Sequence, residues 1–176
     1  MSGQKYEQTI LNNTLMFIIQ LLHDNGINNW FIGYGTLLGI VRENSCIKGD
    51  DDVDIIIDIS NYDIVKKLLI ENNIEIEYGY GIGDKKNILK TKDANNYCSV
   101  DFYMASLDEK GNFNDTWEKV IWSECYNEKN ELIQYIWNDK KLYLPFNYEK
   151  KLFNRYGKNW RIPQNNKGPS PRKTIL

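Results

Sequence analysis

Four aspartates crowd the start of an apolar run. In "KGDDDVDIII" (48–57) they are Asp50, Asp51, Asp52 and Asp54. Carboxylates at this density repel one another, so the cluster predicts a bound cation. On a strand, side chains two residues apart point to the same side, so Asp52 and Asp54 share one face. Two hard carboxylate oxygens on one face suit Mg²⁺ or Mn²⁺, which bind one or two carboxylates together with substrate phosphates.

A third carboxylate is expected from Asp101, which stands in the otherwise apolar segment "CSVDFYM". Buried acids are rare unless they are paired or bound to a metal. An EF-hand is excluded, because its obligatory glycine would be Ile55 and its terminal glutamate would be Asn61. A solvated acidic turn without a ligand remains the alternative interpretation.

A candidate phosphate site precedes the aspartates. Gly35 and Thr36 open a predicted helical turn, whose free N–H groups and positive dipole end favour an anion. Arg42 and Lys48 lie in the sequence between that turn and the carboxylates. A metal ion and a guanidinium around phosphates are typical of phosphoryl and nucleotidyl transfer, because charge is the main obstacle in these reactions.

The elements that must position these residues follow from periodicity and turn residues. The expected elements are a helix over 6–25, a strand over 30–34, one or two helical turns over 36–41, a strand over 53–59, a helix capped by Ser60 or Asn61 and ending at Leu69, a half-exposed strand over 74–80, a glycine-rich hairpin turn over 79–87, a strand over 96–105 and a helix over 148–156. The order of the short aromatic segments between 113 and 144 is not predicted.

Composition predicts a soluble, cytoplasmic protein of one domain, over residues 1–167, with a flexible basic tail over 168–176. The chain has 41% hydrophobic residues and three cysteines without a CxxC pair, which favours a reducing compartment over a disulfide framework. No signal peptide is recognisable, and no apolar run approaches the ~20 residues of a membrane span. The net charge of −2 divides into +7 after residue 148 and −9 before it. This asymmetry favours an anionic substrate, and we do not expect nucleic acid as a partner.

Three motifs in order resemble the LicD/fukutin-related family of nucleotidyltransferase-fold phosphotransferases. They are "GYGTLLGIVRENSCIKGDDDVDI" (33–55), the acid of "VDFY" (100–103), and the pattern Tyr-x3-Leu-x3-Tyr-Gly-x2-Trp-x2-Pro over 148–163. Two positions depart from the family. Gly49 replaces a tryptophan before the acidic cluster, and Tyr34 replaces the first of two glycines.

The resemblance implies an α/β (α+β) fold, a minimal single domain with a mixed sheet flanked by helices. It also implies a metal-dependent transferase that moves phosphocholine or an alditol phosphate, such as ribitol 5-phosphate, from a CDP-linked donor to a hydroxyl of a glycan or glycolipid. The residue roles that it implies are Mg²⁺ (or Mn²⁺) binding for Asp52 and Asp54, a metal ligand or general base for Asp101, phosphate binding for Gly35, Thr36 and Arg42, and orientation of the ligands for Asp50 and Asp51. Lys48 is added to the phosphate-binding residues because of its place in the sequence between Arg42 and the carboxylates.

Two other functions stay open at this point. One is a nucleotidyltransferase that acts on a sugar phosphate or another small molecule, and the other is a non-catalytic binding module with the same fold. For the donor, loss of the family tryptophan at Gly49 removes an aromatic ring beside the expected metal. A quaternary ammonium is usually held by aromatic rings, so we expect CDP-ribitol or CDP-glycerol to be preferred over CDP-choline.

Overall fold

The computed structural model describes residues 5–164 and residue 176. Its helices are α1 (Gln8–Asp24), α2 (Tyr34–Glu43), the 3-10 helix η1 (Ile59–Asn61), α3 (Tyr62–Glu71) and α4 (Tyr148–Tyr156). Its strands are β1 (Trp30–Ile32), β2 (Asp52–Asp58), β3 (Ile88–Lys90), β4 (Ser99–Leu107), β5 (Phe113–Asp115), β6 (Val120–Trp122), β7 (Ile133–Trp137) and β8 (Lys140–Leu144). Helices and strands alternate as far as α3, six strands follow in succession, and α4 comes last, all in one small α/β domain.

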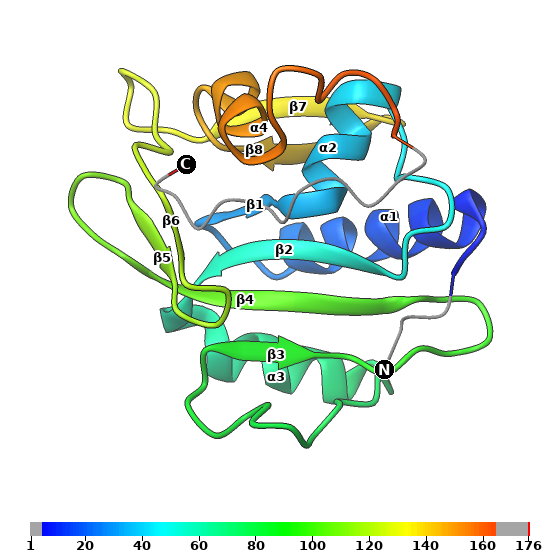
Figure 1. Ribbon diagram of the computed structural model, residues 1–176. Helices are drawn as coiled ribbons and strands as arrows, with labels where there is room; N and C mark the ends of the chain where they lie inside the picture. The colour runs from blue at the N-terminus through cyan, green and yellow to red at the C-terminus, as the bar shows by residue number, and fades with distance from the viewer. Residues whose placement is uncertain (1–4, 165–175) are drawn as a thin grey trace.

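A mixed six-stranded sheet forms the centre, with β2 and β4 in its middle (Figure 1). These two strands run parallel, whereas β1 pairs antiparallel with β2, and β3 and β5 pair antiparallel with β4. Strands β7 and β8 form a separate hairpin. Ile55, Ile56 and Ile57 of β2 are all buried, as expected for a central strand covered on both faces.

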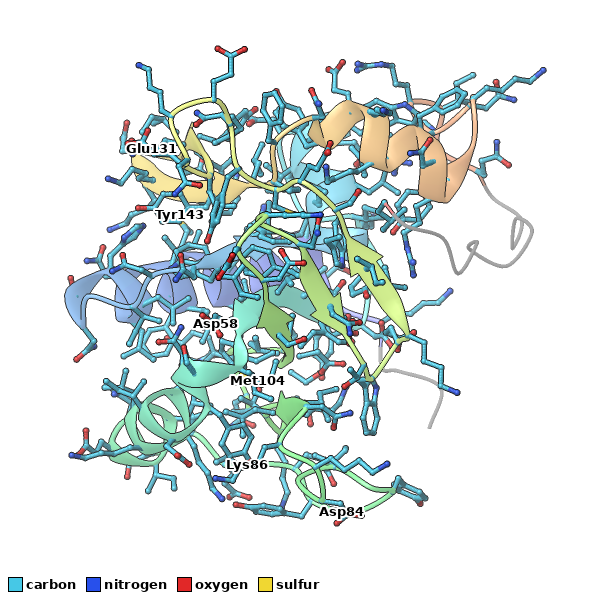
Figure 2. All side chains as sticks on the ribbon, turned by 90° about the vertical axis from the view of Figure 1, so that its left-hand side faces the viewer. Asp58, Asp84, Lys86, Met104, Glu131 and Tyr143 are labelled. Atoms are coloured by element: carbon cyan, nitrogen blue, oxygen red, sulfur yellow. The ribbon has the colours of Figure 1, made fainter. Side chains whose placement is uncertain are left out.

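Helices and the β7–β8 hairpin cover this sheet. Helix α1 packs against β2 and β8, and α2 packs against β2. Figure 1 shows α2 and α4 together beside the β7–β8 hairpin, and α3 beside β3 at the opposite end. In Figure 2, Asp84 and Lys86 mark the loop before β3 at one extreme of the molecule, and Glu131 lies at the other.

Most of the expected elements near the acidic cluster are confirmed. The helix over 6–25 is α1, and Gly26 follows its end with a positive φ of 64°. The strands over 30–34, 53–59 and 96–105 are β1, β2 and β4. The amphipathic C-terminal helix is α4, where Leu152 is buried, and Gly157 is its C-cap with a positive φ of 85°.

One local prediction was wrong, and two confirmed features differ from the expectation in detail. The segment 74–80 is not a strand, because it forms only two isolated bridges, between Ile76 and Thr91 and between Gly79 and Ile82. The alternation of apolar and polar residues does not produce a strand here, because no neighbouring strand pairs with this segment beyond these single bridges. The turn over 36–41 is part of α2, which begins earlier and ends later. At α3, the position of the N-cap is Asn61, but its side chain donates to the carbonyl of Asn28 and makes no capping hydrogen bond.

The expected tail lies outside the described residues up to 175. Leu176 is buried, donates its N–H to the carbonyl of Ile121 and accepts from the N–H of Ser123. Across the described part of the chain, no helix is long and apolar enough to cross a membrane.

Candidate active site

The parallel pairing of β2 and β4 brings the predicted acids together. The register sets Asp54 directly opposite Asp101, and Asp52 lies one pleat away on the same face as Asp54. One carboxylate oxygen from each of the three lies within 4.8 Å of the others. Asp54 and Asp101 are buried, with 6% and 7% of their surface exposed. Three hard oxygens at this spacing fit one Mg²⁺ or Mn²⁺ ion. We call this set the acidic cluster.

Asp50 and Asp51 lie in the turn before β2 and extend this negative region. Carboxylate oxygens of Asp50, Asp51 and Asp52 also lie within 4.8 Å of one another. Asp50 accepts a hydrogen bond from the N–H of Asp51, and its Oδ2 lies against Gly35. A Cβ at Gly35 would be 2.8 Å from that oxygen and 3.7 Å from Oδ2 of Asp54. Glycine therefore lets the first turn of α2 approach both carboxylates.

Thr36 supports the site differently from the expected role. Its buried hydroxyl accepts a hydrogen bond of 2.8 Å from the backbone N–H of Asp54. The hydroxyl thus fixes α2 onto β2 at the position of the acid. The backbone N–H groups of the first turn of α2 remain the groups that can meet an anion, because a helix leaves these donors without intrahelical partners.

Lys90 is a member of the site that sequence reasoning missed. Strand β3 sets Lys90 opposite Asp101, and its Nζ lies 2.7 Å from Oδ1 of Asp101 and 3.8 Å from Oδ2 of Asp52. The available signal was the segment "NILK" after the glycine-rich turn, which continues the predicted hairpin into a strand. Lys90 places one positive charge against the acidic cluster.

Two tyrosines line the cluster on the side of α2. The hydroxyl of Tyr103 donates to Oδ1 of Asp54 at 3.3 Å, and its ring packs edge-on against Tyr34 at 4.8 Å between centroids. The hydroxyl of Tyr34 donates to the fully buried Asp115 at 2.5 Å. The guanidinium of Arg155, from α4, lies 4.3 Å from the centroid of the Tyr34 ring. A chain of contacts therefore links the acidic cluster to α4.

Burial makes full ionisation of the cluster costly. Burial, followed by repulsion from Asp101, raises the pKa of Asp52 to about 8. Burial, followed by repulsion from Asp52, raises the pKa of Asp54 well above its usual range. Burial raises the pKa of Asp101 as well, although Lys90 opposes this effect. A bound divalent cation would stabilise the ionised carboxylates, so the electrostatics fit a metal site.

Within the described residues, Arg42 and Lys48 form no ion pair with the acidic cluster. The guanidinium of Arg42 forms an ion pair with Glu43, its neighbour at the end of α2. Both Arg42 and Lys48 line a groove of about 900 Å³ between α2 and the segment that begins with α4. We call this the α2–α4 groove. It is lined by Leu38, Arg42, Glu43, Ile47, Lys48, Arg155, Tyr156, Gly157, Lys158, Asn159, Trp160, Ile162, Pro163 and Gln164.

Comparisons with solved structures place this geometry in a known fold. The chain is similar to the lincosamide antibiotic adenylyltransferase LnuA in its lincomycin-bound crystal structure, with a TM-score of 0.54, 16% identity, and coverage of 86% of this chain and 87% of that one. It is also similar to the antibiotic-resistance factor ANT(2'')-Ia, with a TM-score of 0.55, 10% identity, and coverage of 78% and 66%. At these identities the likeness shows a nucleotidyltransferase fold.

Sequence comparison identifies the family. No curated protein sequence gives a significant match to the chain. The family profile described as "LicD/FKTN/FKRP, nucleotidyltransferase domain" matches residues 27–155. This range contains the first turn of α2, the acidic cluster, Lys90 and α4 as far as Arg155. The chain therefore belongs to the LicD/FKTN/FKRP family and carries its nucleotidyltransferase domain.

Proposed function

We propose that this protein is a metal-dependent phosphotransferase. It moves a phospho-alditol or phosphocholine group from a CDP-linked donor to a hydroxyl of a glycan or glycoconjugate. The observation that carries the proposal is the convergence of Asp52, Asp54 and Asp101 from two adjacent strands within 4.8 Å. Such a set is costly to bury without a cation, and family membership supports a transferase as the reason for keeping it.

Each acid has a role in this proposal. Asp52 and Asp54 would hold Mg²⁺ or Mn²⁺, and the ion would neutralise charge on the donor pyrophosphate. Asp101 completes the set as a third ligand, a role that its ion pair with Lys90 favours over that of general base. A neighbouring ammonium stabilises the carboxylate and so makes it a weaker proton acceptor. Asp50 and Asp51 add negative field beside the ligands.

Donor phosphates would be bound by the α2 side of the site. The backbone N–H groups of Gly35 and Thr36 belong to the first turn of α2, beside Asp50 and Asp54. Oγ1 of Thr36 accepts the Asp54 N–H, so the hydroxyl could contact a phosphate oxygen only by donating its own O–H. Arg42 and Lys48 would act on phosphate groups from within the α2–α4 groove.

We propose a polyol donor in preference to choline. An aromatic cage needs rings that are free to face a ligand. Of the tryptophans between β4 and α4, Trp122 and Trp137 are fully buried in the core. We therefore expect CDP-ribitol or CDP-glycerol to bind more tightly than CDP-choline. Calorimetry in the presence of Mg²⁺ measures the order, and CDP-choline binding tenfold tighter than both would refute it.

The test of the reaction is to identify which part of the donor is transferred. The protein is incubated with Mg²⁺, a CDP-linked donor and a panel of glycan acceptors. Phosphotransfer joins the alditol phosphate or phosphocholine to the acceptor and releases CMP, and mass spectrometry of the acceptor detects the added group. Asp54→Asn serves as the inactive control. Failure of every CDP donor to bind or react, with folded protein and metal present, would refute the proposal.

Nucleotidyl transfer is the second candidate. It is favoured by the description of the matching family domain and by the likeness to LnuA, which is described as an adenylyltransferase. In that reaction a nucleoside triphosphate transfers its nucleoside monophosphate to a small-molecule acceptor and releases pyrophosphate. A parallel incubation with a nucleoside triphosphate and small-molecule acceptors distinguishes the two reactions, because nucleotidyl transfer releases pyrophosphate instead of CMP and the acceptor gains the mass of a nucleoside monophosphate.

A further inference from the structure

The α2–α4 groove is strongly cationic. Four basic side chains line it, namely Arg42, Lys48, Arg155 and Lys158, against one acid, Glu43. Glu43 is already paired with Arg42. Within residues 5–164, Lys48, Arg155 and Lys158 form no ion pair. A concentration of positive charge in a concave site raises the local concentration of anionic ligands.

Arg155 is the basic residue of this groove that packs on aromatic rings. Its guanidinium carbon lies 4.3 Å from the Tyr34 ring centroid and 5.9 Å from the Tyr156 ring centroid. Its Nε is buried and has no hydrogen-bond partner among the described residues. A buried donor without a partner is unfavourable, so such groups call for a missing acceptor. Guanidinium is also the side-chain group best matched to phosphate oxygens.

The groove reaches the acidic cluster through the residues beside Arg155. The Tyr34 ring under the guanidinium packs on Tyr103, whose hydroxyl donates to Asp54. Burial, with smaller contributions from Asp54 and Asp50, raises the pKa of Tyr156 to about 12. Tyr156 also lines the groove. A chain of packed side chains therefore connects Arg155 with the acidic cluster.

We propose that the α2–α4 groove binds a phosphate group of the substrate, with Arg155 as its contact nearest to the acidic cluster. The proposal rests on the proposed function for the identity of the ligand as a phosphorylated substrate. A groove of about 900 Å³ has the size of sites that take nucleotides or sugar phosphates. The phosphate comes either from the pyrophosphate of the nucleotide donor or from a phosphorylated acceptor.

The test is equilibrium binding without metal, so that the acidic cluster does not contribute a bridging ion. Calorimetry in EDTA measures the dissociation constant of inorganic pyrophosphate for the wild type, Arg155→Gln and Arg161→Gln. Arg161 is the matched control, because it is an exposed arginine of the same segment, pairs with Glu149 and does not line the groove. We expect Arg155→Gln to weaken binding by about tenfold or more, as for loss of a charged hydrogen bond. Arg161→Gln should change it by less than about twofold.

Arg155→Gln could fold poorly, because the Arg155 guanidinium packs on Tyr34, so a second variant tests the groove independently. The double change Lys48→Gln and Lys158→Gln removes two groove charges that make no ion pair with the described residues. It should also weaken pyrophosphate binding and reduce its salt dependence. Equal affinity of the wild type, the double variant and a folded Arg155→Gln would overturn the proposal, as would a loss in Arg161→Gln as large as in Arg155→Gln.

Two further titrations assign the source of the phosphate. If the groove holds the donor, Arg155→Gln weakens CDP binding and leaves glycerol 3-phosphate unaffected. If the groove holds a phosphorylated acceptor, glycerol 3-phosphate binding is the one that weakens. If anion binding depends on Arg155 but the protein transfers no group from any donor, phosphate binding in the groove is supported and the proposed function is refuted. If Arg155→Gln changes neither transfer nor anion binding, phosphate binding in the groove is refuted and the proposed function is supported.

Discussion

Replacing Lys90 with methionine tests whether a built-in cation stabilises the acidic cluster before metal binds. Methionine keeps an unbranched apolar stem and removes the ammonium, whose Nζ lies 2.7 Å from Asp101 and 3.8 Å from Asp52. The Lys90 side chain is 29% exposed and that of Asp101 is 9% exposed. Breaking a fully buried pair costs about 3–5 kcal/mol, whereas an exposed pair contributes about 0–1 kcal/mol. For this intermediate burial we expect a loss of about 2 kcal/mol in the free energy of unfolding.

Urea unfolding in EDTA measures this loss, with Lys92→Met as the matched control. Lys92 lies two residues along the chain and pairs with Glu75 at 3.1 Å, but both side chains are largely exposed. The control should therefore lose clearly less stability than Lys90→Met. Adding Mg²⁺ should stabilise Lys90→Met more than the wild type, because the ion meets the carboxylates without displacing an ammonium. The gain follows from ligand binding to the folded state alone.

Two results would refute this reasoning. An equal loss for Lys90→Met and Lys92→Met would mean that the ion pair with Asp101 contributes no more than a surface pair. A smaller Mg²⁺ stabilisation in Lys90→Met than in the wild type would mean that Lys90 supports metal binding. In that case the Lys90 ammonium would bind the carboxylates together with Mg²⁺ and would not take the place of the ion in the metal-free protein.

Three further predictions concern the site and its support. Asp54→Asn should abolish transfer and stabilisation by Mg²⁺ without lowering the stability of the metal-free protein, since it removes one of several repelling carboxylates. Asp50→Asn should lose transfer only in part. Equal losses in the two variants would mean that the pair of metal ligands is misassigned. Gly39→Ala should lower the free energy of unfolding by about 1–3 kcal/mol, because the added Cβ would lie 2.6 Å from the carbonyl oxygen of Ser45. Urea unfolding measures this loss, and an unchanged stability would mean that the backbone at Ser45 moves to accommodate the Cβ at little cost. Burial lowers the pKa of Lys151 in the folded state, so the unfolded chain binds more protons. The stability of the wild type relative to Lys151→Met should therefore increase as the pH rises towards the pKa of free lysine. A difference between these two proteins that is constant from pH 7 to 10 would contradict the shifted pKa.

The sequence by itself determined the parts of the site that depend on local pattern. Strand alternation is a property of a few consecutive residues, so Asp52 and Asp54 could be placed on one face before any partner strand was known. An isolated acid in an apolar run identified Asp101, because burying a charge is too costly to occur without a reason. The spacing of Tyr148, Leu152 and Tyr156 likewise identified α4, and the order of the motifs identified the family.

Only the tertiary structure decided which distant groups meet those acids. The register of β2 on β4 sets Asp54 opposite Asp101, and the pairing of β3 brings Lys90 to the same point. The contact of Thr36 with the Asp54 N–H and the position of Arg42 in the α2–α4 groove also depend on how α2 docks on the sheet. The physical reason is that local periodicity specifies which face a side chain occupies. Strand register and helix docking are instead set by the packing of segments that are far apart in the chain.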